Sequence, residues 1–155
     1  MKRRLLVWCL VASLAVLAEA FFIQSLHVVS PSLLVPAILY TVSKHNGVGI
    51  GLALWLGFLL DAVAVGPFGL YMVISSGMLM LARALNNRGL EFGYMPILFA
   101  ASSILLGWQY VVFTVVGFMT GTYEVGLMSY LITLFIAQIL VTALSSFVLL
   151  RLMRV

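Results

Sequence analysis

The sequence predicts an all-α integral membrane protein: one transmembrane domain, residues 1–155, built as a bundle of six transmembrane helices. Composition is the first observation behind this prediction. Hydrophobic residues occupy 65% of the 155 positions, charged residues occupy 8%, and the mean hydropathy is +1.25. A soluble domain is about half apolar and a quarter charged. The other two observations are apolar runs of spanning length and basic residues confined to alternate connections.

The apolar residues fall into runs that short polar breaks separate. A helix crosses the hydrocarbon core with about 20 residues, and most of the runs come close to that length. We predict spans over residues 5–23, 31–42, 48–65, 69–84, 96–118 and 125–150. The connections between them are too short to hold a soluble domain.

The first two spans each leave an alternative open. "AEA" at residues 18–20 imitates the cleavage site of a secretion signal, but further spans follow, so we expect an uncleaved first helix. The second run has only 12 residues and would rise about 18 Å, well short of the hydrocarbon thickness. It either begins near Leu26 with Pro31 as a kink, or it is a short helix shielded by its neighbours.

The remaining spans differ in the residues that interrupt them. The third is rich in glycine and carries Asp61, and the turn "GPFG", residues 66–69, separates it from the fourth. The last two are long apolar runs in which the polar residues are uncharged. These interruptions, rather than the apolar residues, are where we look for function.

Basic residues indicate how the spans are oriented, because Lys and Arg in short loops stay on the cytoplasmic side. The three connections "QSLHVVS", "GPF" and "TGTYE" contain neither residue. With six spans, all eight basic residues fall on the opposite side: Lys2, Arg3, Arg4, Lys44, Arg83, Arg88, Arg151 and Arg154. We therefore expect a multi-pass protein with both termini in the cytoplasm. The net charge of +4 is then an orientation signal, and it gives no reason to expect nucleic acid as a partner.

Motifs of catalysis and metal binding are absent from the sequence. It contains no Walker loop, no HExxH and no GxSxG. The two histidines, His27 and His45, fall in loops on opposite sides of the predicted bilayer, and the lone Cys9 excludes an intrachain disulfide. We expect no enzyme activity, no catalytic residue, no cofactor and no metal site.

Small residues recur every fourth position in the third span. Gly49, Ala53, Gly57 and Asp61 follow this spacing, which places them along one helix face. Between helices in lipid, such a face matters because it lets a second backbone approach closely. We predict a helix-docking face that ends in an acid. Its occupant is either another helix of this chain or the helix of a partner protein.

Two acids lie within the predicted spans at similar depth, Glu19 in the first and Asp61 in the third. An acid in the bilayer costs a few kcal/mol, so neither is expected to be idle. One reading is that Asp61 accepts hydrogen bonds from amides of the turn at Gly66 and Gly69. The other is that one or both acids bind a cation or a donor on a partner helix. With Tyr71, they could also form a polar site in the outer leaflet.

Polar uncharged residues form a second pattern. In the last span Gln138, Thr142 and Ser145, or Ser146 in its place, lie along one helix face. The fifth span offers Ser102 and Gln109, seven residues apart. Such residues either join helices of the bundle by hydrogen bonds or line a substrate cavity.

Residues 31–80, "PSLLVPAILYTVSKHNGVGIGLALWLGFLLDAVAVGPFGLYMVISSGMLML", resemble the central region of MreD, a family of bacterial rod shape-determining membrane proteins. The shared features are a second helix that follows a proline, a short basic turn, a glycine-rich third helix ending in an acid, and a "GPxG" turn before the fourth helix. Size, six spans and cytoplasmic termini agree as well. Ser32 departs from the pattern, since an acid is expected after that proline.

The resemblance implies a non-enzymatic scaffold or adaptor of the cell-elongation (rod-shape) machinery, or elongasome, in the bacterial cytoplasmic (inner) membrane. It would help organise peptidoglycan synthesis and cell shape. The implied partner is MreC, a single-span membrane protein, and through it the MreB filament, RodA and the penicillin-binding transpeptidase. Apart from these proteins, only membrane lipid is expected. The MreC helix would dock on Gly49, Ala53 and Gly57, with Asp61 at the outer rim.

An alternative of another class follows from helix count and layout. MreD is similar in both to the S-components of energy-coupling-factor (ECF) transporters, which bind a vitamin-like substrate near their outer face. In that case Glu19, Asp61 and Tyr71 would line a ligand pocket. The Ala-x-x-x-Ala pattern common in the first helix of S-components is missing here, since Ala12, Ala15, Ala18 and Ala20 never fall four apart.

Overall fold

The chain is all-helical over the residues that the computed structural model describes, which confirms this part of the predicted fold class. Described are residues 7–18, 32–44, 49–63, 67–90, 92, 94–121 and 128–152, with the side chains of 44, 128–134, 149–150 and 152 excepted. These residues contain six helices and no strand: Val7–Ala18, α2 (Leu34–Lys44), α3 (Gly49–Val63), α4 (Leu70–Asn87), α5 (Met95–Met119) and α6 (Met128–Leu152).

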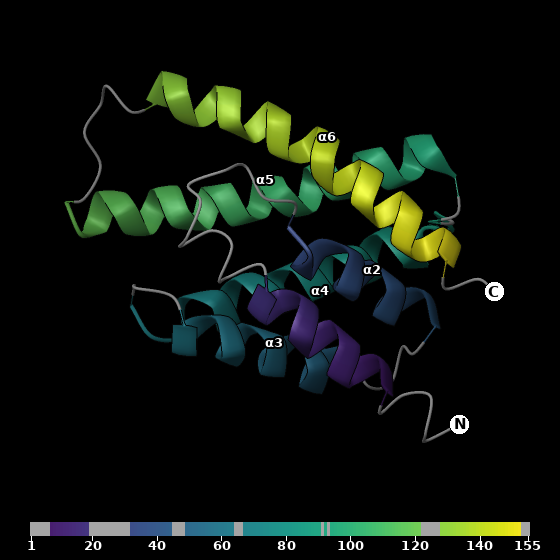
Figure 1. The fold of residues 1–155 in the computed structure, drawn as a ribbon. Helices are drawn as coiled ribbons and strands as arrows, with labels where there is room; N and C mark the ends of the chain where they lie inside the picture. The colour runs from purple at the N-terminus through teal and green to yellow at the C-terminus, as the bar shows by residue number, and fades with distance from the viewer. Residues whose placement is uncertain are drawn as a thin grey trace.

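Successive helices run in opposite directions (Figure 1). Helices α2, α4 and α6 end on the side of the bundle where the N-terminal helix, α3 and α5 begin. Arg88 follows α4 directly and Arg151 lies in the last turn of α6. These two basic residues therefore belong to the same end of the bundle, as the predicted orientation requires.

Helix α2 occupies the centre of the fold despite its length of 11 residues. It packs against α3, α4, α5 and α6, and residues 34–39 are all buried. The described part of the second span is therefore a short helix shielded by its neighbours. The alternative, an earlier start with a kink at Pro31, lies outside the described residues.

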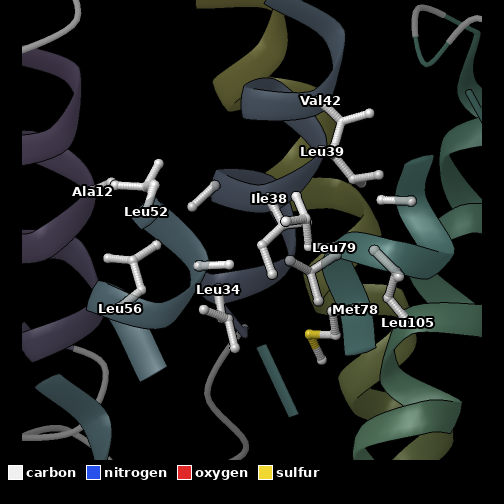
Figure 2. Packing of buried hydrophobic residues seen from close by; sticks show 14 of the residues in the cluster. Ala12, Leu34, Ile38, Leu39, Val42, Leu52, Leu56, Met78, Leu79 and Leu105 are labelled. Atoms are coloured by element: carbon white, nitrogen blue, oxygen red, sulfur yellow. The ribbon is translucent and has the colours of Figure 1, made fainter. Parts of the chain in front are cut away.

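The hydrophobic core is built around α2 (Figure 2). Ile38 and Leu39 of α2 face Leu79 of α4, while Leu52 and Leu56 of α3 fill the space toward the N-terminal helix. All of these side chains are 6% exposed or less. The core thus joins α3 and α4 on one side to α5 and α6 on the other through α2.

Within the described residues, helix length and composition identify one candidate membrane crossing. Among the described helices, α5 with its 25 residues is the one long and apolar enough to cross a membrane by itself. The N-terminal helix, α2 and α3 are apolar but shorter, and the 15 residues of α3 rise only about 22 Å. The structure therefore supports a membrane-associated chain with one candidate span.

Candidate functional site

Asp61 caps a helix other than its own. It lies in the last turn of α3 and is 8% exposed. Its Oδ1 accepts a hydrogen bond from the N–H of Tyr71 at 2.9 Å, and its Oδ2 accepts one from the N–H of Met72 at 3.2 Å. These are the second and third residues of α4, where N–H groups have no acceptor within their own helix. A carboxylate at a helix N-terminus is also favoured by the helix dipole.

The turn before α4 explains why the cap comes from elsewhere. Gly69 occupies the N-cap position with φ 96°, a left-handed conformation that glycine adopts without strain. Glycine has no side chain with which to cap the amides that follow. Asp61 supplies the missing acceptor across the interface. Asp61 thus accepts main-chain hydrogen bonds as predicted, but the donors are Tyr71 and Met72 in the first turn of α4 and not Gly69 of the turn. The other predicted donor, Gly66, lies outside the described residues.

Gly57 brings the backbones of α3 and α4 into contact. A Cβ atom placed on it would lie 2.7 Å from the Met72 Cα and 2.7 Å from the Tyr71 carbonyl oxygen. A side chain at this position would therefore separate the helices. The same two residues of α4 also donate their amides to Asp61, so close backbone packing and capping depend on one another.

The rest of the small-residue face, Gly49 and Ala53, also lies in the interior. A Cβ on Gly49 would lie 3.0 Å from the Leu79 side chain and 3.1 Å from the Arg83 guanidinium, both on α4. Ala53 is 2% exposed. The occupant of the face is thus α4 of the same chain, the first of the two that the sequence leaves open.

The outer-leaflet polar site predicted from Glu19, Asp61 and Tyr71 is described only in part. Asp61 meets Tyr71 through the main-chain amide, while the Tyr71 ring packs edge-on against Phe113 with centroids 5.5 Å apart. Glu19 lies outside the described residues.

The polar stripe of α6 binds several partners rather than one. The Gln138 Oε1 accepts a hydrogen bond from the Tyr110 hydroxyl of α5 at 2.8 Å. The Thr142 Oγ1 accepts the N–H of Ser32, just before α2, at 3.0 Å. Ser145 donates to the Thr142 carbonyl within α6 at 2.9 Å. Gln138 and Thr142 thus join helices, whereas Ser145 stays within its own helix.

The two polar residues predicted in α5, Ser102 and Gln109, do not join helices in this way. Among the described residues, the Ser102 Oγ and the Gln109 Oε1 are buried without a hydrogen-bond partner. The neighbouring Trp108 Nε1 is also unpaired, and its indole lies over Gly77 of α4, where a Cβ would come within about 2.5 Å of the Trp108 Cε2. Sequence reasoning missed this Gly77 contact; a glycine inside a helical run was the available signal.

The described residues hold no group of three His, Cys, Asp or Glu side chains that could bind a metal ion. His27, His45, Glu91 and Glu124 fall outside them.

Three comparisons of this chain with known proteins found no match. No protein-family model, no curated protein and no solved structure matches this chain.

Proposed function

We propose that this chain is a multi-pass protein of the bacterial cytoplasmic membrane that acts as a non-enzymatic scaffold of the cell-elongation machinery, similar to MreD. In this proposal six helices cross the bilayer, both termini are cytoplasmic, and MreC is the direct partner. The observation that carries the membrane assignment is the distribution of apolar residues over the outside of the bundle.

Large apolar side chains are exposed on helices all around the bundle. Leu14 of the N-terminal helix is 59% exposed, Met80 of α4 70%, Val111 of α5 56% and Leu144 of α6 56%. Soluble monomers rarely expose such contiguous apolar surface, whereas lipid favours it. The interior, in turn, holds small polar residues: Ser32, Thr41, Ser75, Ser102, Thr142 and Ser146. This is the pattern expected of helices that face lipid and join one another through polar groups.

The proposed orientation has a direct test. Arg88 and Arg151 lie at one end of the bundle, which supports a cytoplasmic position for that end. Fluorescent protein fused after residue 155 should fluoresce in cells, because it folds in the cytoplasm, and alkaline phosphatase at the same site should be inactive. The reverse result would exclude a cytoplasmic C-terminus.

The MreD-like role rests on residues 31–80, which carry the resemblance and contain α2, α3 and the first part of α4. In the structure these helices form one packed unit in which Asp61 caps α4. A packed unit of this kind is what a scaffold offers to partners. It supports the proposed role without assigning any chemistry to Asp61.

The contact with MreC is proposed for the outward face of α3, because α4 covers the small-residue face. A Cβ added to Gly51 would meet nothing within 4 Å. Because glycine has no side chain, this exposed position leaves a notch in the outward face of α3. Exposed Leu54, Trp55 and Phe58 continue the face along α3. A notch beside large apolar side chains suits the approach of a single transmembrane helix.

Two matched substitutions test this contact. Gly51→Leu fills the notch on α3, whereas Gly107→Leu adds the same side chain to α5, where a Cβ also meets nothing within 4 Å. We expect Gly51→Leu to abolish co-purification with MreC and Gly107→Leu to retain it, with unchanged membrane insertion of both. Equal recovery of MreC with both variants would remove the outward face from the interface. Failure of the unmodified chain to recover MreC would overturn the proposed partnership.

The S-component alternative receives less support from the site. Both oxygens of Asp61 already accept amides of α4, so the carboxylate is engaged within the chain. A vitamin-like molecule found by mass spectrometry in the purified protein would nevertheless favour that alternative over the scaffold.

A further inference from the structure

Helix α5 extends beyond the beginning of α4 at the end of the bundle opposite to the basic residues. The ring of Tyr71, the second residue of α4, packs against Phe113 of α5 with centroids 5.5 Å apart. The indole of Trp108 over Gly77 gives the same antiparallel register further along the two helices. From Phe113, α5 continues to Met119, and these six further residues rise about 9 Å. Figure 1 shows the last turns of α5 beyond the ends of α3 and α4.

The projecting end of α5 has an apolar surface. Val115, Phe118 and Met119 are all more than half exposed, and no charged side chain occurs in α5. Contact of these side chains with water would cost free energy in proportion to their exposed area. Polar residues begin directly after the helix, in "TGTYE", residues 120–124. In the proposed membrane, hydrocarbon is therefore expected to reach the end of α5.

The turn before α4 differs in composition from the connection after α5. It reads "GPFG", residues 66–69, which contains no polar side chain, and Phe68 is exposed. Because α4 begins about 9 Å short of the end of α5, hydrocarbon that covers all of α5 also reaches the level of this turn. An exposed phenylalanine suits hydrocarbon better than water.

The first four amides of α4 are all hydrogen-bonded. The Leu70 N–H donates to the Pro67 carbonyl at 3.3 Å, and the next two amides donate to Asp61. The Val73 N–H donates to the Gly69 carbonyl at 3.1 Å. At a helix end in water these groups could bond the solvent, but in hydrocarbon each must be bonded within the protein. The beginning of α4 meets the second, stricter condition.

We propose that the α3–α4 turn is submerged: it lies within the hydrocarbon of the outer leaflet, about 9 Å below the end of α5 along that helix, and lipid acyl chains cover Phe68. This inference rests on the proposed membrane orientation and refines it. Helices α3 and α4 cross the centre of the bilayer but end inside the outer leaflet, so both termini remain cytoplasmic. The competing arrangement places the turn in water and leaves the apolar end of α5 outside the membrane.

Cysteine labelling in spheroplasts tests the depth of the turn. Phe68 and Met119 are a matched pair, because they are 71% and 82% exposed, and each is replaced by cysteine in a chain whose lone Cys9 is changed to alanine. A membrane-impermeant maleimide should label Phe68→Cys at least about tenfold more slowly than Met119→Cys, because a thiol in hydrocarbon forms little of the reactive thiolate. After denaturation both should react alike. Equal rates in spheroplasts would overturn the submerged turn.

A third variant separates this inference from the proposed orientation. Asn87 is exposed in the last turn of α4, at the proposed cytoplasmic end, so Asn87→Cys should stay unlabelled until the membrane is permeabilised. Labelling of Asn87→Cys from outside would overturn the orientation and, with it, the outer-leaflet position of the turn. Protected Asn87→Cys together with rapidly labelled Phe68→Cys would overturn the submerged turn alone.

Spin labels on the same cysteines identify what covers the turn. In proteoliposomes of the purified chain, a label at position 68 should collide often with oxygen, which dissolves in hydrocarbon, and rarely with a water-soluble nickel complex. Its ratio of oxygen to nickel collisions should exceed that of a label at position 119. Rare collisions with both would mean that protein covers Phe68 and would overturn lipid as the occupant. If Phe68→Cys does not fold, Pro67→Cys replaces it, because Pro67 is exposed in the same turn and accepts its hydrogen bond through the main chain.

Discussion

The two helix pairs of this bundle are joined by different means. Between α3 and α4, Gly57 allows the backbones to touch, and the Asp61 carboxylate accepts two amides of the facing helix. Between α5 and α6, the described side chains form one hydrogen bond across the interface, from Tyr110 to Gln138, and two serine hydroxyls face the interior unpaired. The first joint thus combines backbone contact with capping, whereas the second leaves two buried hydroxyls without a partner among the described residues.

The difference shows that glycine and serine have different effects on how helices pack in an apolar bundle. Glycine shortens the distance between helices, which allows main-chain groups such as the Tyr71 amide to be bonded across the interface. Serine keeps the helices apart by its own volume and brings a hydroxyl that then needs a partner. We therefore expect the α3–α4 joint to tolerate substitution poorly and the α5–α6 joint to tolerate it well.

The largest effect is expected at Gly57. Gly57→Ala places a methyl group 2.7 Å from main-chain atoms of α4, and forcing the helices apart should cost about 3 kcal/mol of unfolding free energy. Gly51→Ala on the same helix meets open space and should stabilise the chain by up to about 1 kcal/mol through helix propensity. SDS-induced unfolding in mixed micelles measures both. Similar stability of the two variants would contradict the closed joint.

A smaller effect is expected at Asp61. Asp61→Ala leaves the amides of Tyr71 and Met72 without their acceptor, which should cost about 2 kcal/mol. Asp61→Asn retains a carbonyl oxygen and should cost less. Hydrogen exchange resolved at the two amides locates the change, because both should exchange faster in Asp61→Ala than in the unmodified chain. Unchanged exchange would show that the carboxylate does not protect them.

The smallest effect is expected at Tyr110. Tyr110→Phe removes the hydrogen bond to Gln138 but keeps the aromatic contact with Phe135, whose ring centroid lies 4.7 Å away. Interhelical hydrogen bonds in membranes contribute about 0.6 kcal/mol on average, so SDS unfolding should shift by about that amount. A loss as large as that of Asp61→Ala would erase the distinction between the two joints.

The sequence predicted the helices well because apolar runs and polar breaks are local features. Five predicted runs overlap helices α2 to α6, and the short α2 was visible from its length alone. The spacing of Gly49, Ala53 and Gly57 also predicted a close helix contact correctly. It could not name the occupant, because the register between two helices depends on tertiary packing that spacing within one helix does not encode.

The polar groups were harder to predict for the same reason. Gln138 and Thr142 were recognised as candidates, but their partners Tyr110 and Ser32 lie 28 and 110 residues away in the chain. No local pattern links such positions. Ser145 and Ser146 were interchangeable in the sequence, and only the packing of α6 separates the buried Ser146 from Ser145, which bonds its own helix.

The capping of α4 by Asp61 has a consequence for biogenesis. If α3 entered the bilayer alone, the Asp61 carboxylate would have no hydrogen-bond donor. If α4 entered alone, its first amides would have no acceptor. When the two helices enter as a hairpin, the hydrogen bonds between Asp61 and the α4 amides lower the free-energy cost of removing these groups from water. In the proposed membrane setting, α3 should therefore wait at the insertion machinery until α4 has emerged from the ribosome.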